Sequence, residues 1–210
     1  MTAQEVYEII KNYGNYNETT ICHLHKPQNI PCYLDPNFNC TNISHTQLLD
    51  FDKVTTDYCS DHDKEIYSST DALSYKSNHL LFIEIKGWRQ FVLYQLQNKF
   101  NQAKIEKQEN EYNLNKKFEE SILVCKDIIT PNTFPADENI IYILIIDTDS
   151  KRQDAKYQLL QNLNTLAYDS SSIYVTIDKV TDAHLQESVK RPVRKMRVFC
   201  QNFDQIFNNL

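Results

Sequence analysis

The sequence predicts one α/β domain spanning residues 1–210, built on a single central mixed β-sheet flanked by helices. Two runs, "HLLFIEIKG" (79–87) and "NIIYILIID" (139–147), are almost continuously apolar. Such runs are typical of interior strands that are covered on both faces. Helical and strand-like segments alternate along the chain, which is the order of an α/β fold with one central sheet. A length of 210 residues suits one domain with a sizeable core.

The first half of the chain begins with a helix and continues into a strand hairpin. Apolar residues recur on one face of residues 2–13, with Thr2 as a cap and Gly14 as a stop. Residues 48–59 are compatible with a strand or a short helix. The segment "KEIYSSTDALSY" contains a strand that ends near Asp71, and a turn at "KSNH" joins it to the strand that begins in 79–87.

The second half alternates between helix and strand. No proline or glycine interrupts the segment from Trp88 to about Ile129, which favours helix, although its middle, "EKQENEYNLNKK", is polar nearly all round. That middle is either an exposed helix or a break between two helices. A helix around 152–167, a strand "SIYVTI" (172–177) and a basic C-terminal segment complete the prediction.

Composition limits the classes of function. The formal net charge of −6 argues against a protein that coats nucleic acid through its overall field. No window approaches the roughly 20 apolar residues of a membrane span, and no secretory signal begins the chain, so we expect a cytoplasmic protein without a membrane partner. The six cysteines follow no compact disulfide framework, and reduced thiols are expected.

Two opposite charges interrupt the apolar run at 79–87 and need a physical reason. Glu84 and Lys86 alternate with apolar neighbours, so in a strand they share one face at about 7 Å spacing between Cα atoms. The hairpin carries Asp71 back beside Glu84. Two carboxylates and one ammonium then converge at one end of the sheet, where an unpaired charge would be costly.

This convergence has a chemical interpretation. Mg²⁺ prefers oxygen ligands and usually takes one or two protein carboxylates. The ion can lower the pKa of a water and neutralise a phosphate oxygen, while a neighbouring lysine stabilises charge that develops in the transition state. The alternative interpretation is a structural ion pair on an ordinary strand.

The spacing of Asp71 and "Glu84-Ile85-Lys86" resembles the signature of the PD-(D/E)xK nuclease superfamily. "TDALSY", "LLFIEIKG" and "KKFEESILV" are also similar to a bacterial subgroup, with its Cys, Phe and Asn positions replaced. The resemblance implies a restriction-endonuclease-like fold and a metal-dependent endonuclease that hydrolyses DNA in prokaryotic defence or repair. Asp71, Glu84 and the Ile85 carbonyl would hold Mg²⁺ or Mn²⁺, and Lys86 would position the attacking water.

The resemblance implies further site residues. Glu5 on the first helix would be an additional metal ligand, against the alternative of an exposed acid at a helix start. Lys117 and Ser121 would contact phosphate from a later helix, against a solvated helix face. Gln90 and Gln95 follow the motif and are candidates to face the cleft.

Two other clusters carry competing interpretations. "VKRPVRKMRVF" gathers Arg191, Arg194 and Lys195 into a candidate phosphate-binding patch, or a segment that docks on an acidic partner. Cys22, His23, His25, Cys32 and Cys40 are the donor types of a zinc site, but their spacing matches no common finger. A different class of function is a nuclease-like subunit that works as a protein-interaction module in a larger complex.

Overall fold

The computed structural model describes the chain except residues 27–28, 35–42, 98, 130–133 and 149–169. A six-stranded sheet lies at its centre, in the order β1-β2-β3-β4-β5-β6. Neighbours from β1 to β4 are antiparallel, and β4, β5 and β6 are parallel. The strands are β1 (Glu18–Thr19), β2 (Leu48–Asp50), β3 (Ala72–Lys76), β4 (His79–Lys86), β5 (Ile140–Ile146) and β6 (Arg194–Phe199). The prediction of an α/β fold with one mixed sheet and flanking helices is confirmed.

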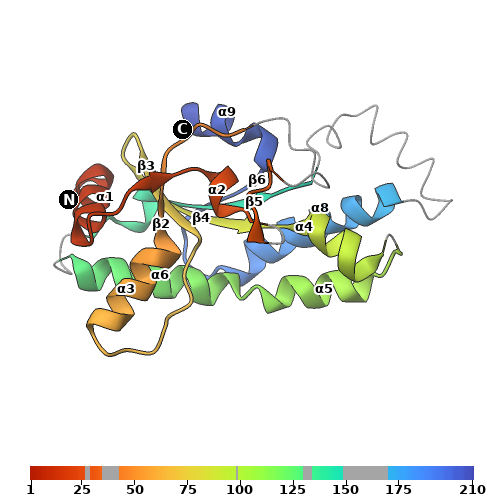
Figure 1. Cartoon of the computed structure of the whole chain (residues 1–210), viewed down its shortest axis with the longest axis horizontal. Coiled ribbons are helices and arrows are strands. Elements are labelled where there is room, and N and C mark those ends of the chain that lie inside the picture. The colour runs from red at the N-terminus through yellow and green to blue at the C-terminus, as the bar shows by residue number, and fades with distance from the viewer. Residues whose placement is uncertain (27–28, 35–42, 98, 130–133, 149–169) are drawn as a thin grey trace.

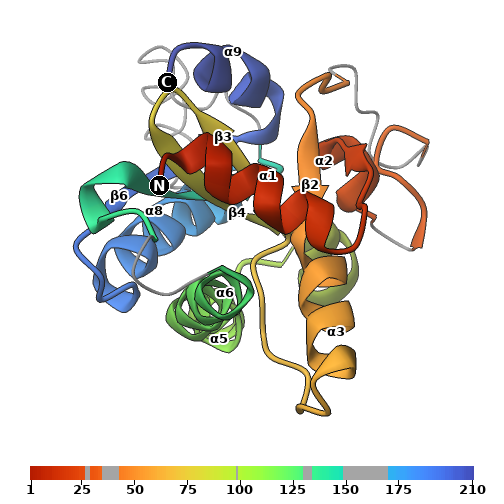
Figure 2. The ribbon, with the colours of Figure 1, turned by 90° about the vertical axis from the view of Figure 1, so that its left-hand side faces the viewer.

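Helices cover both faces of this sheet. Figure 1 shows α5, α6 and α8 on one side of the sheet and α2 and α9 on the other, and Figure 2 shows α1 crossing β3 and β4. The helices are α1 (Ala3–Tyr13), α2 (Ile21–Leu24), α3 (Phe51–Asp61), α4 (Trp88–Gln90), α5 (Gln102–Glu111), α6 (Leu114–Ile128), α8 (Ser170–Ser188) and α9 (Phe203–Asn208), with a π-helix at Phe91–Leu96 and 3₁₀ turns at Asp137–Asn139 and Cys200–Asn202. None of the described helices is both long enough and apolar enough to cross a bilayer.

The side chains of β4 alternate between the two cores, and this alternation positions Glu84. Leu80 and Phe82 pack with α1, α3 and α6, whereas Leu81 and Ile83 pack with α2 and α9. Successive side chains of a strand point to opposite faces. Glu84 therefore continues the row of Leu80 and Phe82, on the face that α6 covers.

The first helix and the hairpin follow their sequence signals. Thr2 caps α1, its side chain accepting the backbone N–H of Glu5. A two-residue turn joins β3 to β4, with Ser77 at φ 53°. The expectation that a strand ends near Asp71 is wrong, because β3 begins one residue later. The first strand residues, Ala72 and Leu73, are the ones that enter the core, while the carbonyl of Asp71 turns to accept the N–H of Phe51.

The helical segment after β4 is broken twice. Gln97 at φ 48° ends the π-helix, and the Asn101 side chain caps the start of α5 by accepting the N–H of Lys104. Asn113 at φ 50° separates α5 from α6. This second break lies inside "EKQENEYNLNKK". Of the two alternatives for that segment, an exposed helix or a break between two helices, the structure shows the break. Residues 48–59 likewise contain both expected forms, since β2 leads directly into α3.

The strand predicted at 172–177 is wrong, because those residues lie in α8. The buried residues Ile173, Ile177, Thr181 and Leu185 recur every four positions, which is the spacing of a helix face. β-branched residues favour strands only weakly, and packing against the sheet overrides that preference here. The helix expected at 152–167 lies outside the described residues.

The burial pattern of α8 can be tested by paired truncations. We expect Ile177→Ala, at a fully buried position, to lower the free energy of unfolding by about 2–5 kcal/mol. Val175→Ala, at a partly exposed position two residues away, should have a clearly smaller effect, because less apolar surface is lost and alanine favours helix. Urea unfolding followed by circular dichroism measures both. Equal losses would indicate the period of a strand and contradict the helix.

Candidate active site

The hairpin places two carboxylates at one end of the sheet. Ala72 pairs with Ile83, so the preceding residue, Asp71, lies opposite Glu84. The Ile85 N–H donates a hydrogen bond to Asp71 Oδ2 at 2.5 Å. Glu84 is fully buried, whereas the Asp71 side chain keeps 21% of its surface exposed. Glu84 is therefore enclosed, whereas Asp71 is mostly buried and keeps only part of its side chain open to solvent.

Two ammonium groups meet the buried carboxylate. Lys86, on the same face of β4, forms an ion pair with Glu84 Oε1. Lys117 of α6 lies 2.8 Å from the same oxygen and 3.8 Å from Asp71 Oδ1. The Lys117 ammonium thus lies close to both carboxyl groups at once. The structure brings Asp71, Glu84, Lys86 and Lys117 together in one cluster.

The aromatic residue Tyr112 fixes the position of Lys86. The Lys86 ammonium lies 4.4 Å from the centre of the Tyr112 ring, and that ring packs edge-on against Trp88 at 5.5 Å. A cation over an aromatic face is stabilised, and more so when it is shielded from water. The Lys86 side chain is only 13% exposed. Its ammonium is thus held beside the buried carboxylate of Glu84.

Charge and burial change the proton affinities within the cluster. Burial, and then the nearby charge of Glu84, raise the pKa of Asp71 to about 7, although Lys117 and Lys86 oppose this shift. Burial alone would lower the pKa of Lys117, but the carboxylates of Glu84 and Asp71 outweigh it and raise the pKa. Lys117 is therefore held in its charged form, while Asp71 can exchange a proton near neutral pH.

The loop before β3 is tied to α6 by Ser121. The buried Ser121 hydroxyl accepts the N–H of Thr70 at 2.9 Å and donates to the carbonyl of Lys117 at 2.7 Å. Asp52 accepts a hydrogen bond from the Ser69 hydroxyl at 2.5 Å, and burial raises the pKa of Asp52. Ser121, expected to contact phosphate, is instead an internal link that aligns Asp71 with Lys117. Sequence analysis missed Asp52, since only the fold brings α3 beside this loop.

The residues present suit a small divalent cation. Oε2 of Glu84 is buried and accepts no hydrogen bond from the described residues. Asp71 and Glu84 offer two carboxylates, the number that Mg²⁺ ordinarily takes, with water and backbone carbonyls completing its shell. Within the described ranges no group of three or more His, Cys, Asp or Glu side chains could hold a metal ion. A cation here would therefore rest on two carboxylates.

Glu5 is not brought to this cluster. Its carboxylate accepts the Thr2 N–H at 2.7 Å, completing the capping box of α1 at an exposed position. That bond, followed by the Thr2 hydroxyl, lowers the pKa of Glu5. Its expected role as a metal ligand is therefore replaced by helix capping. Of the two glutamines, Gln90 lies beside Gly87 and Gln95 is exposed on the π-helix.

The expected phosphate patch is largely engaged within the chain. Arg191 binds both carboxylate oxygens of Glu119 and also Asp137, contacts that raise its pKa. The Lys195 ammonium donates to the Val189 carbonyl at 2.5 Å. These contacts fasten the end of α8 and the start of β6. Arg194 is exposed at the start of β6, where its backbone pairs with Ile141 of β5.

The cysteine and histidine stretch does not form a zinc site among the described residues. Cys22 and Cys32 are buried in the core on the α2 face. His23 lies within hydrogen-bond distance of the Thr20 hydroxyl at 3.0 Å and of the Tyr33 hydroxyl at 3.1 Å. Cys40 lies outside the described residues.

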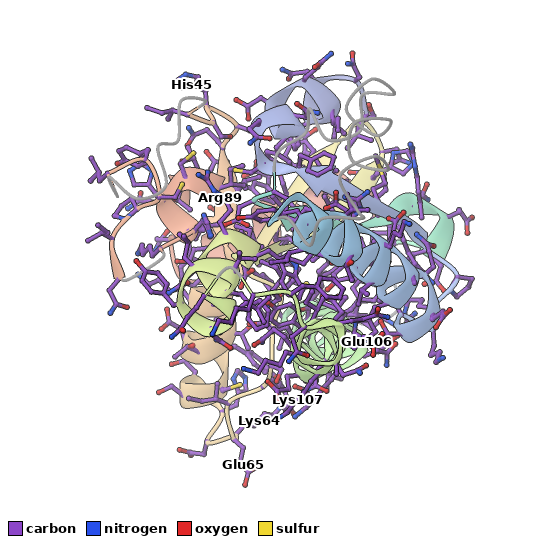
Figure 3. The ribbon with its side chains drawn as sticks, turned by 90° about the vertical axis from the view of Figure 1, so that its right-hand side faces the viewer. His45, Lys64, Glu65, Arg89, Glu106 and Lys107 are labelled. Carbon is purple, nitrogen blue, oxygen red and sulfur yellow. The ribbon has the colours of Figure 1, made fainter. Side chains whose placement is uncertain are left out.

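A second buried pair, which sequence analysis missed, lies next to the motif. His25 Nε2 is 3.6 Å from Asp147 Oδ2, and Asp147 Oδ1 accepts a hydrogen bond from the Arg89 N–H at 2.9 Å. Arg89 is labelled in Figure 3, in which the right-hand side of Figure 1 faces the viewer. A Cβ on Gly87 would lie 3.0 Å from that histidine nitrogen, so a side chain there would crowd it. The available signal was the position of Asp147, directly after a buried strand.

Comparisons of the chain with protein-family models, with curated proteins and with solved structures found no match.

The raised pKa of Asp71 predicts a pH-dependent stability. The folded chain holds this proton more tightly than the unfolded chain, whose aspartate has the ordinary value of 3.8. The stabilisation is complete below pH 3.8 and is lost as the pH rises through about 7. Relative to wild type, Asp71→Asn should therefore gain stability between about pH 4 and pH 8. Urea unfolding of both chains across this range measures the difference, and a difference independent of pH would contradict it.

Proposed function

We propose that this chain is a metal-dependent phosphodiesterase that hydrolyses DNA, with a restriction-endonuclease-like fold. The observation that carries the proposal is the cluster of Asp71, Glu84, Lys86 and Lys117 at the end of the β3–β4 hairpin. The resemblance of Asp71 and "Glu84-Ile85-Lys86" to the PD-(D/E)xK signature supports it. The parallel arrangement of β4, β5 and β6 behind the hairpin is compatible with it as an analogy of fold.

The cation site would consist of Asp71, Glu84 and the Ile85 carbonyl. When bound, Mg²⁺ or Mn²⁺ would lower the pKa of a nearby water and neutralise charge on a phosphate oxygen. Asp71 presents the solvent-exposed side of this site, and Glu84 presents an oxygen with no hydrogen-bond donor among the described residues.

The two lysines would act on the phosphate and its nucleophile. Lys86, held against Tyr112, would donate a hydrogen bond that orients the attacking water, and would stabilise charge that develops on phosphorus-bound oxygens. A new bond forms between the water oxygen and phosphorus as the bond to the leaving sugar oxygen breaks. The water gives up one proton and the leaving oxygen takes one up, so the products are one phosphomonoester and one alcohol. Lys117, whose own pKa is raised by the neighbouring carboxylates, would pair with Glu84 and offset charge on the approaching phosphate.

A second candidate function is a nuclease-like subunit that acts mainly as a protein-interaction module. The internal contacts of Arg191 and Lys195 favour it, because they occupy basic groups that were expected to follow DNA phosphates. The net charge of −6 favours it as well. Cleavage by the purified chain alone supports the enzyme, whereas cleavage only after a partner is added supports the subunit.

The catalytic role of Lys86 can be tested on supercoiled plasmid DNA with Mg²⁺ or Mn²⁺. We expect Lys86→Ala to reduce the nicking rate at least about 100-fold, because it removes a charged donor aimed at the reacting oxygens. Lys107→Ala is the matched control, since Lys107 lies on α5 with 78% of its side chain exposed (Figure 3). Equal nicking by wild type and Lys86→Ala would remove the catalytic assignment.

A further inference from the structure

The outer edge of β3 is only partly paired. Two pairs, Leu49 with Leu73 and Asp50 with Ala72, join β2 to β3. On its other side β3 pairs with β4 over its whole length, from Ala72 to Lys76. In the part of the chain that the structure describes, Ser74–Lys76 therefore has a partner strand on one side and none on the other.

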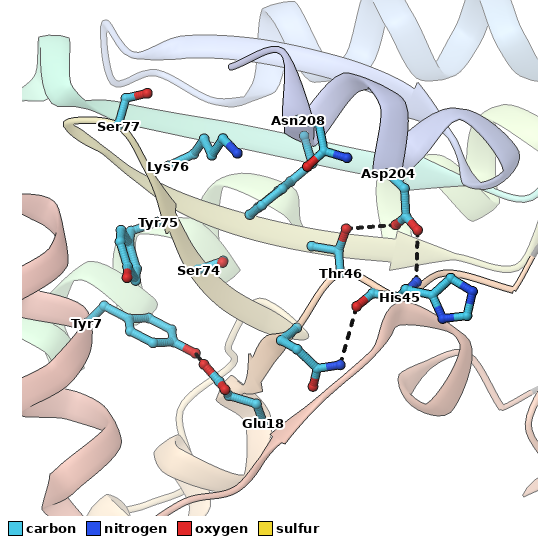
Figure 4. Close-up of a pocket in the computed structure, with 12 residues that line it drawn as sticks. Tyr7, Glu18, His45, Thr46, Ser74, Tyr75, Lys76, Ser77, Asp204 and Asn208 are labelled. Atoms are coloured by element: carbon cyan, nitrogen blue, oxygen red, sulfur yellow. Dashed lines mark hydrogen bonds between the residues drawn. The ribbon is translucent and has the colours of Figure 1, made fainter.

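The segment that would close this edge is held elsewhere. If the antiparallel register of β2 continued, Leu48 of β2 would face Ser74, and residues 46–47 before it would face residues 75–76. Instead Asp204 of α9 accepts the His45 N–H at 2.8 Å and the Thr46 hydroxyl at 2.7 Å (Figure 4). The Ser44 hydroxyl adds a third bond to the same carboxylate. These bonds outweigh burial and lower the pKa of Asp204, so the carboxylate remains charged and the segment stays fixed to α9.

A pocket of about 520 Å³ occupies the resulting gap. Figure 4 shows it between β3, the segment at 45–47 and α9, with Tyr7 and Glu18 at its far end. The volume falls in the ordinary range of ligand sites, about 300–1,000 Å³. Because one wall is a strand edge, an extended backbone can both fill the pocket and complete the hydrogen bonding of the sheet.

The charges of the pocket indicate what side chains that backbone would carry. Glu18 is already paired with the Tyr7 hydroxyl at 2.7 Å and with Lys11 at 3.2 Å, and Asp204 binds its three donors. Lys76 lies over the Phe207 ring at 5.2 Å and has no carboxylate partner among the described residues. The donors to Asp204 are neutral, so its negative charge remains and the pocket holds charges of both signs. Lys76 is the cation of the pocket lining that has no carboxylate partner among the described residues, and an acidic group placed beside it would pair with it.

The two faces of the edge differ. Ser74 and Lys76 point to the α9 face, whereas Tyr75 points to the opposite face and packs against Tyr7 with ring centres 5.1 Å apart. A strand added beside β3 would alternate in the same way. An acidic residue would lie beside Lys76, and its neighbour would place an apolar side chain beside Tyr75.

We propose that Ser74–Lys76 is a docking edge for an extended peptide segment of a partner protein, which adds to the sheet as a strand and places an acidic residue beside Lys76. The docking edge lies at the turn end of β3, whereas Asp71 precedes the other end. The proposal is thus independent of the hydrolytic function.

A random heptapeptide library displayed on phage tests the proposal. Selection on the wild-type chain should enrich alternating sequences that carry Asp or Glu, and the enriched peptide, once synthesised, should slow amide hydrogen exchange at residues 74–76. Methylation of the peptide's backbone nitrogens along the edge that pairs with β3 should abolish binding. Lys76→Glu should weaken the Kd at least about tenfold, by replacing an attractive charge with a repulsive one.

The controls separate this site from the candidate active site. Lys107→Glu and Lys86→Ala should bind the peptide as wild type does, and the same peptide with Lys in place of its acid should prefer Lys76→Glu. The proposal is wrong if no peptide is enriched, if Lys76→Glu binds the selected peptide equally, or if exchange slows elsewhere. The proposal is also wrong if amide hydrogen exchange at residues 74–76 slows when the protein concentration is raised without any peptide. The occupant of the edge would then be a second copy of this chain.

Discussion

The carboxylate of Glu84, fully enclosed between the sheet and α6, is the constraint on which the rest of this site depends. Isolated charges are rarely left inside a protein, because removing them from water costs several kcal/mol per ion. Glu84 is accommodated by Lys86 from its own strand and Lys117 from α6. The sheet and α6 are thereby coupled electrostatically, and Ser121 adds a hydrogen-bonded link at the same junction.

This arrangement leaves part of the cluster without hydrogen-bond partners among the described residues. Two ammoniums offset two carboxylates, yet one Glu84 oxygen has no hydrogen-bond donor among the described residues and Asp71 is partly open to solvent. A pair made only for stability has a simpler solution, since apolar side chains of similar volume often stabilise a core as well. Under the two proposals made above, β3 would serve two purposes. The hydrolytic site lies before its first residue, and the docking edge lies at its last residues.

The parts that sequence could predict are those encoded by neighbouring residues. β4 and β5 were evident because their apolar runs admit few alternatives, and α1 because Thr2 marks its first turn. The alternation of Glu84 and Lys86 placed both on one face. α8 was missed because its β-branched residues mimic a strand, and only the four-residue spacing of Ile173 and Ile177 reveals the helix.

The parts that sequence could not predict depend on distant partners. Lys117 was expected to meet phosphate, but its carboxylate partners become visible only when α6 is placed against the hairpin. In the sequence Arg191 belongs to a cluster of basic residues, but in the fold it pairs with Glu119, which is distant along the chain. Likewise the bonds from His45 and Thr46 to Asp204, some 160 residues away, leave no local pattern. Such contacts are decided by tertiary packing rather than by propensity.

The most direct test of the central claim is a titration with Mn²⁺ followed by electron paramagnetic resonance, in which bound ion leaves the free-ion spectrum. Wild type should bind one equivalent, and Glu84→Gln and Asp71→Asn should each weaken the Kd at least about tenfold, since each removes one of two charged ligands. Glu109→Gln, at an equally buried acid beside His184, should bind as wild type does. If all four chains bound Mn²⁺ alike, or none bound it, the cluster would not be a cation site.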